Sequence, residues 1–494
     1  MKNNSNHGAW LRLPLALLLV TSFAASAGAQ RGARRAARRG VAKHVVSVLE
    51  RDVRAHEEFL ASDAMQGRGS GTQFELLAGM YVGAQLRQFG VEPAGDADAT
   101  GQKTYIQTVD LTRPAFASAP TLSFGTGATA RKWTNGQEIL IARVVTPRVS
   151  GALQKLKANE SLKPGAFVLL TPEEGTDQRQ LQTRALALWQ QGASVVLVAE
   201  TPQWRQRWAA MSQRLPQLPA AADAGQGGGL VVLSADAYKT LQEASDGTPL
   251  TLEGALGEPR RGQTYNAVGV LRGSDPKLAS EVILLTAHMD HLGVAGVEGN
   301  QCRAAGADTV CNGADDDASG VVAVLELARV LGAGVRPKRT VYFVTFGSEE
   351  RGGSGAQYFL AHPPVPLAQM TANLEFEMIG RPDPKVEQGT LWLTGFDRSN
   401  LGAELAKQGA RLVADPHPEQ NFFQRSDNYA LARRGVVAHT VSSFGLHPEY
   451  HQPTDDLAHL DIPHMTRAIN SMVQPVIWLV NSAFKPAWVE GKKP

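Results

Sequence analysis

The sequence of 494 residues has little of what several common classes of protein need. Two cysteines are too few for a zinc site built from four thiolates. A formal net charge of +2 gives no reason to expect a nucleic acid as partner. The hydrophobic fraction of 43% and the charged fraction of 19% are typical of a soluble globular protein, and the length allows two or three domains.

Long apolar runs are also scarce, and the one that stands out lies near the N-terminus. Lys2 and Arg12 precede the run LPLALLLV, and the small residues of AASAGAQ follow it. The run is too short to cross a membrane and has the three parts of a signal peptide. We therefore expect residues 1–29 to be a signal peptide and residues 30–43 a flexible basic arm. The mature chain is expected to be periplasmic or secreted, without a membrane span.

The two cysteines, Cys302 and Cys311, lie close together in the sequence. Because an exported protein meets an oxidising compartment, we predict a disulfide between them. The alternative is that both are metal ligands. We rank it lower, since thiolate sites usually have four such ligands or histidines nearby.

The apolar pattern divides the rest of the chain into three stretches. Residues 44–110 show two helical patterns around the loop AMQGRGSGT, which lacks the Lys-Ser/Thr ending of a phosphate-binding loop. Residues 111–262 contain short β-like runs between turns rich in Pro and Gly. Residues 263–488 alternate strands with helices. The sequence predicts an α/β fold, with a mixed, mostly parallel sheet flanked by helices, and a smaller β-rich domain inserted at residues 111–262.

Three adjacent aspartates, Asp315, Asp316 and Asp317, occur in the segment NGADDDASG, just before a helical pattern. Adjacent like charges repel, so such a row needs a cause. One explanation is a solvated turn in which Asp317 or Ser319 caps the following helix. The other is a cation bound at the end of a strand.

Further residues of metal-binding types lie at the ends of the predicted strands or in the segments that follow them. They are His288 and Asp290, Glu349 and Glu350, Glu377, and His451. Parallel strands place their carboxyl ends at one edge of a sheet, where ligands usually bind, so these side chains should gather there. Several buried carboxylates are costly unless cations offset their charge. Two histidines and three carboxylates suit zinc or manganese.

The order of the blocks AHMD, GADDDASG, SEE, FEM and YHQPTD resembles the co-catalytic di-zinc aminopeptidase family. That family includes secreted bacterial leucyl aminopeptidases and, more distantly, glutamate carboxypeptidases. The resemblance covers the two leading helical patterns and the stretch from Tyr265 to the last helix. The middle stretch is similar, more loosely, to a protease-associated domain inserted in many relatives.

The resemblance implies two zinc ions that share one aspartate. One ion would be held by His288, Asp316 and Glu377. The other would be held by Asp316, Glu350 and His451. Glu349 would be the general base. Asp290 would be the carboxylate that orients His288.

Two further expectations concern the aspartate row. The family implies a cis peptide bond between Asp316 and Asp317, and turn-forming or helix-capping roles suit Asp315 and Asp317. The sequence also departs from the family at two positions. Glu377 stands where Asp is common. Asn428 stands where His is frequent, and we expect that change to affect specificity more than metal binding.

The activity implied is hydrolysis of the N-terminal residue from peptides with a free N-terminus. Phe422, Phe423 and Tyr429 are candidates for lining the side-chain pocket, although core packing is an alternative for at least one of them. Other readings are a glutaminyl cyclase-like enzyme, a non-catalytic binding protein, or a carboxypeptidase of the same fold. The candidate carboxylate-binding residues of such a carboxypeptidase are Arg381, Arg425 and Arg434.

Overall fold

The computed structural model describes residues 47–127, 130–156, 161–171, 178–212, 215–218, 228–297 and 299–494. The predicted signal peptide and basic arm therefore lie outside the described residues. Within the described part of the chain, no helix combines the length and the apolar character needed to cross a membrane.

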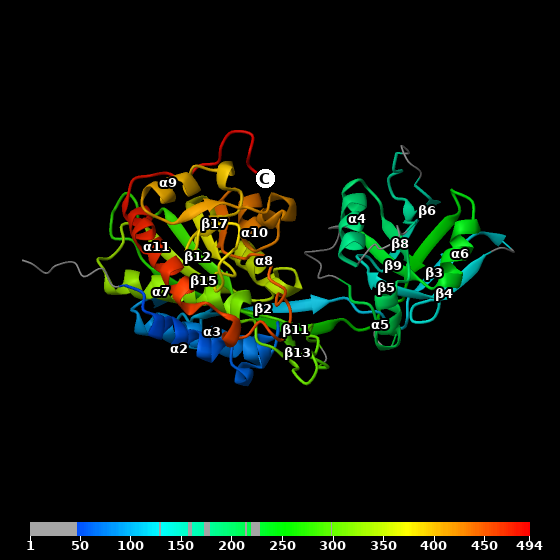
Figure 1. Ribbon diagram of the computed structural model, residues 1–494, viewed down its shortest axis with the longest axis horizontal. Helices are drawn as coiled ribbons and strands as arrows, with labels where there is room; N and C mark the ends of the chain where they lie inside the picture. The colour runs from blue at the N-terminus through cyan, green and yellow to red at the C-terminus, as the bar shows by residue number, and fades with distance from the viewer. Residues whose placement is uncertain are drawn as a thin grey trace, which may run out of the picture. The chain divides into compact units, whose positions relative to one another are not determined.

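A nine-stranded sheet lies at the centre of the α/β part, in the order β1-β11-β15-β12-β16-β19-β17-β18, with β2 paired to β11 (Figure 1). Its strands are β1 (Glu92–Pro93), β2 (Ile106–Arg113), β11 (Arg260–Leu271), β12 (Val282–His288), β15 (Thr340–Phe346), β16 (Met370–Phe376), β17 (Leu391–Leu393), β18 (Leu412–Ala414) and β19 (Val437–Ser442). Strands β15, β12, β16 and β19 are parallel, and antiparallel pairings with β11 and β17 flank them. The predicted mixed sheet is confirmed, with its parallel strands at the centre.

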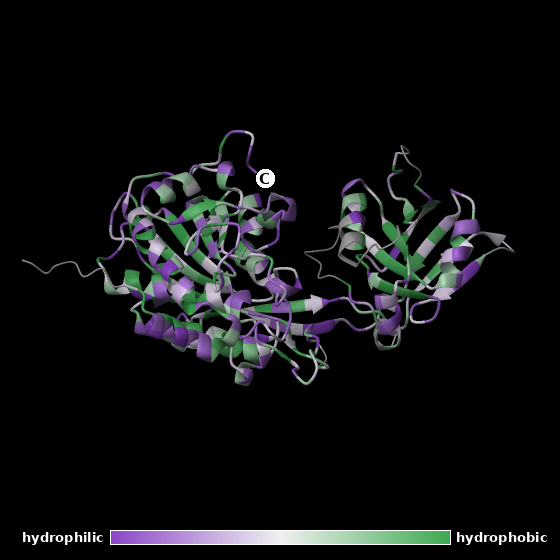
Figure 2. Cartoon of the chain, viewed as in Figure 1, coloured by the Kyte–Doolittle hydropathy of each residue, from purple (hydrophilic) through white to green (hydrophobic). Residues whose placement is uncertain are grey.

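Helices cover this sheet, which is why its central strands are mostly apolar (Figure 2). Every residue of β12, β15 and β19 is buried. The helices are α2 (Glu50–Leu60), α3 (Gln73–Gln88), α7 (Gly320–Ala333), α8 (Ser354–Ala361), α9 (Leu401–Lys407), α10 (Asn428–Arg433) and α11 (Ile462–Asn481). Helix α7 packs on β12, β15 and β16 and contacts α2, α3 and α11. Helices α8 and α10 share an apolar core with alternate strand residues such as Leu284 and Val344.

Residues 121–253 contribute a second sheet of eight strands, in the order β4-β3-β10-β6-β7-β8-β9-β5. The strands are β3 (Thr121–Phe124), β4 (Arg131–Thr134), β5 (Ile139–Arg143), β6 (Arg148–Gln154), β7 (Phe167–Leu169), β8 (Val195–Ala199), β9 (Gly229–Leu233) and β10 (Pro249–Glu253), with helices α4 (Gln178–Gln190), α5 (Pro202–Ser212) and α6 (Ala235–Glu243). Two apolar clusters draw only on residues between Phe116 and Leu252. This stretch therefore has cores of its own.

The strands that lead into and out of this stretch belong to the first sheet. β2 and β11 pair without interruption from Ile106 and Ala267 to Arg113 and Arg260. The first sheet thus extends a few residues beyond residues 111 and 262, where we expect the inserted domain to begin and end. The domain division itself stays a prediction.

The segment before the aspartate row is held from several sides. Cys302 and Cys311 form a disulfide, as predicted, and this excludes them as metal ligands. Cys311 ends β14 (Val310–Cys311), which pairs with β13 (Gly293–Val294). The next residue, Asn312, donates a hydrogen bond to the carbonyl of Ala61 at 2.9 Å. The buried guanidinium of Arg68 donates to the carbonyl of Asn312 at 2.7 Å.

Replacing both cysteines by alanine should lower the free energy of unfolding by roughly 2–3 kcal/mol. This is the contribution expected when a disulfide that closes so short a loop no longer restricts the unfolded chain. Urea titration of the oxidised protein and of the double variant measures the difference. The reduced native protein is the matched control and should resemble the variant. Equal stability of the variant and the oxidised protein would contradict this prediction.

Candidate metal centre

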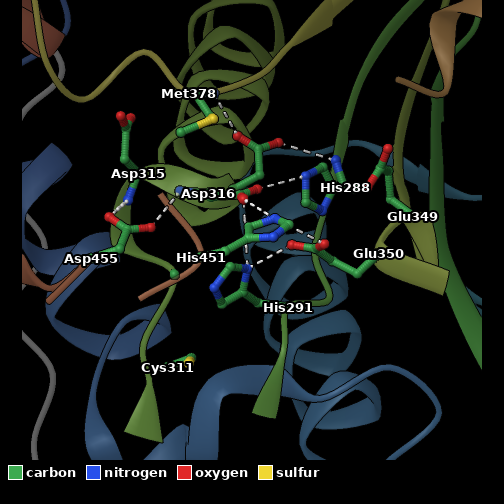
Figure 3. Close-up of polar contacts among 12 residues, drawn as sticks. His288, His291, Cys311, Asp315, Asp316, Glu349, Glu350, Met378, His451 and Asp455 are labelled. Carbon is green, nitrogen blue, oxygen red and sulfur yellow. Dashed lines mark hydrogen bonds and ion pairs between the residues drawn. The ribbon is translucent and has the colours of Figure 1, made fainter. Parts of the chain in front are cut away.

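The predicted site residues converge at the carboxyl ends of the parallel strands (Figure 3). His288 is the last residue of β12, and Glu377 directly follows β16. Glu349 begins the short helix η5 (Glu349–Arg351) after β15, and His451 lies in the loop after β19. Asp316 lies in the distorted turn η4 (Ala314–Ser319) that leads into α7.

The carboxylate of Asp316 lies between two imidazoles. Its Oδ1 is 3.1 Å from Nε2 of His288, and its Oδ2 is 3.2 Å from Nε2 of His451. The same nitrogen of His451 is 3.2 Å from Oε2 of Glu350. Each oxygen of one carboxylate therefore faces a different imidazole, as a carboxylate shared by two cations requires.

The orientation of His288 fits a metal ligand. Its Nδ1 lies 3.1 Å from the backbone carbonyl of Asp290, so that nitrogen carries the proton and donates it. Nε2 is then an acceptor, and it is buried without a hydrogen-bond partner among the described residues. It faces a carboxylate oxygen of Asp316, which is also an acceptor. Two acceptors at this distance repel unless a cation or a proton lies between them.

The pKa shifts of the buried side chains in the cluster also favour bound cations. Burial raises the pKa of Glu349 well above its usual value and also raises the pKa of Glu377. Burial alone would lower the pKa of His451, but the carboxylates of Asp316 and Glu350 outweigh it and raise the pKa to about 10. Burial would raise the pKa of Asp316, but His288 and His451 outweigh it and lower that pKa well below its usual value. Burial and the charge of Asp316 would raise the pKa of Glu350, but His291 and His451 lower it. The carboxylates that face the imidazoles therefore stay ionised, which suits bound divalent cations.

Asp290 is completely buried beside His288. Its carboxylate accepts a hydrogen bond from the hydroxyl of Ser70 and, at 3.0 Å, one from the backbone N–H of Glu349. Nδ1 of His288 is 3.8 Å from Oδ1 of Asp290 and closer to its backbone carbonyl. Asp290 thus joins the end of β12 to the turn that carries Glu349. A role of its carboxylate in orienting His288 stays a prediction.

The aspartate row is not a solvated turn, because all three side chains are buried. Asp317 accepts hydrogen bonds from the backbone N–H groups of Gly320 and Met378, both at 3.0 Å. It therefore caps the start of α7, as expected, and also ties that start to the end of β16. The peptide bond between Asp316 and Asp317 is cis, as the family resemblance implies.

Asp315 and the loop that carries His451 hold each other in place. Asp315 accepts a hydrogen bond from the backbone N–H of Gly380 at 2.7 Å and lies 2.9 Å from Nε2 of His447. The carboxylate of Asp455 accepts from the backbone N–H groups of Asp315 and Asp316, at 2.9 Å and 3.0 Å. These contacts fix the position of the His451 loop relative to Asp316.

One residue of the cluster, His291, was not foreseen from the sequence. It is completely buried, and its Nδ1 lies 2.8 Å from Oε1 of Glu350, while Oε2 of Glu350 faces His451. Within the described residues, His291, Asp316 and Glu350 form a group close enough to hold a metal ion. The sequence feature that could have indicated this residue is its position directly after Asp290, the last residue of the block AHMD. The hydrogen bond to Glu350 favours an orienting role.

A cavity opens beside the cluster and contains Glu349 and Glu377 in its wall, next to Asp316 and His451. Of the predicted pocket aromatics, only Phe422 lines it. Phe423 belongs to the apolar core, and Tyr429 packs against that core. The other aromatic and apolar side chains of the cavity are Met378, Trp392, Phe444 and Tyr450.

Asn428 does not line this cavity. Its backbone N–H donates to the carboxylate of Glu375, and its side chain donates to the carbonyl of Phe423 at 3.3 Å. Its expected effect on specificity would therefore have to be indirect.

Residues 266–475 match the sequence profile of a family described as Peptidase family M28. Aminopeptidase YwaD of Bacillus subtilis (strain 168) is 22% identical over 234 residues, which cover 46% of this chain and 47% of that protein. A probable zinc metalloprotease of Pyrenophora tritici-repentis (strain Pt-1C-BFP) is 41% identical over 78 residues, 16% of this chain and 17% of that protein. The chain thus spans less than half the length of these curated relatives.

Among solved structures, an aminopeptidase from Aneurinibacillus sp. strain AM-1 is similar, with a TM-score of 0.53 and 17% identity. The similarity covers 88% of this chain and 95% of that one, and at this identity it shows the fold.

Replacing His291 by leucine removes the donor to Glu350 and should weaken zinc binding by about 10–100-fold, as for other groups that orient ligands. His291→Asn is the matched control, because its amide can donate from nearly the same place and should restore most of the affinity. Titration with a competing chelator measures both variants. Unchanged affinity in His291→Leu would contradict the orienting role, and failure of His291→Asn to restore it would indicate direct coordination.

Proposed function

We propose that the chain, whose residues 266–475 match the profile of Peptidase family M28, is a metallo-aminopeptidase that removes N-terminal residues from peptides. The observation that carries this proposal is the carboxylate of Asp316, with one histidine facing each of its oxygens. Glu349 lies in the same cavity and has no ion pair with a histidine among the described residues. It is thus available as a base.

The donor set supports two zinc ions, and zinc is named for the fungal relative. His288, Asp316 and Glu377 would hold one ion, and Asp316, Glu350 and His451 the other. When bound, such a pair supplies an activated water and polarises the scissile carbonyl. Nitrogen and carboxylate ligands of this kind, without thiolates, are usual for catalytic zinc.

The residues of the chain would then move the proton and position the substrate. Glu349 accepts the proton of the attacking water and delivers it to the leaving amine. Burial raises the pKa of Glu349, which helps it to hold the proton between these two transfers. Tyr450 stacks on His451 at 3.9 Å between ring centres and lines the cavity. Its hydroxyl is a donor for the carbonyl oxygen as negative charge develops there.

The charges around the cavity favour a free N-terminus over a C-terminal carboxylate. Asp316, Glu349 and Glu377 form its acidic side, which attracts an α-ammonium group. Of the arginines considered for a carboxypeptidase, Arg381 is paired with Glu449 at 2.7 Å. Arg434 does not line the cavity, and Arg425 is the single arginine that does among the residues the structure describes.

We also infer that residues 111–262 are an inserted protease-associated domain without catalytic residues. Support comes from their separate sheet and cores, and from the fact that every residue of the metal cluster lies outside them. Export through the signal peptide at residues 1–29 completes the proposal, and places the enzyme in the periplasm or outside the cell.

The purified protein should hydrolyse aminoacyl 4-nitroanilides, fail on their N-acetylated forms, and lose activity with a chelator. Glu349→Gln should lower turnover by about 10²–10⁴-fold while zinc content is retained, because Glu349 is a base and not a ligand. Turnover and zinc content are measured on the same preparation. Near-normal turnover in Glu349→Gln, or release of C-terminal residues from N-blocked peptides, would contradict the proposal.

A further inference from the structure

We propose that the cavity beside the metal cluster selects an N-terminal residue with a neutral side chain whose tip accepts a hydrogen bond. Tyrosine and glutamine carry such a tip and are the residues used to test the inference. This inference rests on the proposed aminopeptidase activity and specifies its substrate class.

The walls of the cavity are aromatic and held in fixed positions. Trp392 stacks on Phe422 with ring centres 5.4 Å apart, and Phe422 meets Phe444 edge to face at 5.7 Å. The indole N–H of Trp392 donates to the buried carboxylate of Asp383 at 3.0 Å, and His417 contacts the same oxygen at 2.8 Å. A flat or unbranched side chain packs well against such walls.

The strands behind these walls supply hydroxyl groups. Thr394 directly follows β17, and Thr440 and Ser442 lie on β19 beside it; all three line the cavity. The hydroxyl of Ser442 is used, because it donates to the carbonyl of Met378 and accepts from the backbone of Phe444.

The other two hydroxyls still have hydrogen atoms to donate. The hydroxyl of Thr440 is buried and has no hydrogen-bond partner among the described residues. Thr394 is equally buried, and its hydroxyl only accepts a bond, at 2.9 Å from the backbone N–H of Thr440. A buried donor without a partner is costly, and an acceptor at the tip of a bound side chain would satisfy it.

The surroundings of the cavity disfavour ionised side chains. An acidic side chain would place its carboxylate against the buried rings of Trp392, Phe422 and Phe444, where a charge loses its hydration. A lysine or an arginine would meet the same cost and would also be repelled by Arg425, which is exposed and lies over the ring of Phe422 at 4.9 Å. These costs leave neutral side chains, and the free hydroxyls favour the polar ones among them.

The test compares substrates that differ at the tip of the side chain. Values of kcat/KM for tyrosyl and phenylalanyl 4-nitroanilides form one pair, and glutaminyl and methionyl 4-nitroanilides form the second. We expect the polar member of each pair to be preferred by about tenfold, the effect of one hydrogen bond to a buried group. Hydrolysis of all four substrates without this preference overturns the inference and leaves the proposed function standing. Hydrolysis of none of them overturns both.

Two variants assign the preference to Thr440. Thr440→Val keeps the shape and removes the hydroxyl, so the tyrosine-to-phenylalanine ratio should fall towards one. Thr440→Ser keeps the hydroxyl and should retain the ratio. Because both substrates are measured on the same preparation, the ratio does not depend on the folded fraction. An unchanged ratio in Thr440→Val contradicts the role given to this hydroxyl.

Discussion

The burial of three adjacent aspartates at the end of a strand is the constraint on which the rest of the site depends. Asp317 is satisfied by backbone amides at the start of α7 and the end of β16. Asp315 is satisfied by the amide of Gly380 and by His447. Asp316 turns its carboxylate towards His288 and His451, so its charge is the one left for cations to neutralise.

The same contacts link the metal cluster to the substrate cavity. Asp455 holds the His451 loop to the aspartate turn, and that loop also brings Tyr450 to the cavity wall. Met378, whose backbone N–H binds Asp317, lines the cavity as well. The positions of ligands and of substrate-facing groups therefore depend on one set of buried polar contacts, which supports the precise geometry that catalysis requires.

The sequence was most informative where apolar runs end. Continuous apolar strands such as β12 and β15 must be buried on both faces, so the residues that follow them could be assigned to one edge of the sheet. The sequence was less informative about contacts between distant segments. The sequence did not predict that His291 belongs to the metal cluster. Its place there depends on a contact with Glu350, a residue distant in the chain. The two phenylalanines at 422 and 423 look equivalent in the sequence, but they sit in a tight turn and point to different surroundings, one to the cavity and the other to the core.

The central claim is that one carboxylate, that of Asp316, is shared by two zinc ions. Anomalous diffraction from crystals of the zinc-loaded protein, recorded at the zinc absorption edge, tests it most directly. Two peaks about 3.5–4 Å apart are expected, one on each side of the Asp316 carboxylate, near His288 and near His451. A single peak, or peaks that do not contact Asp316, would contradict the claim.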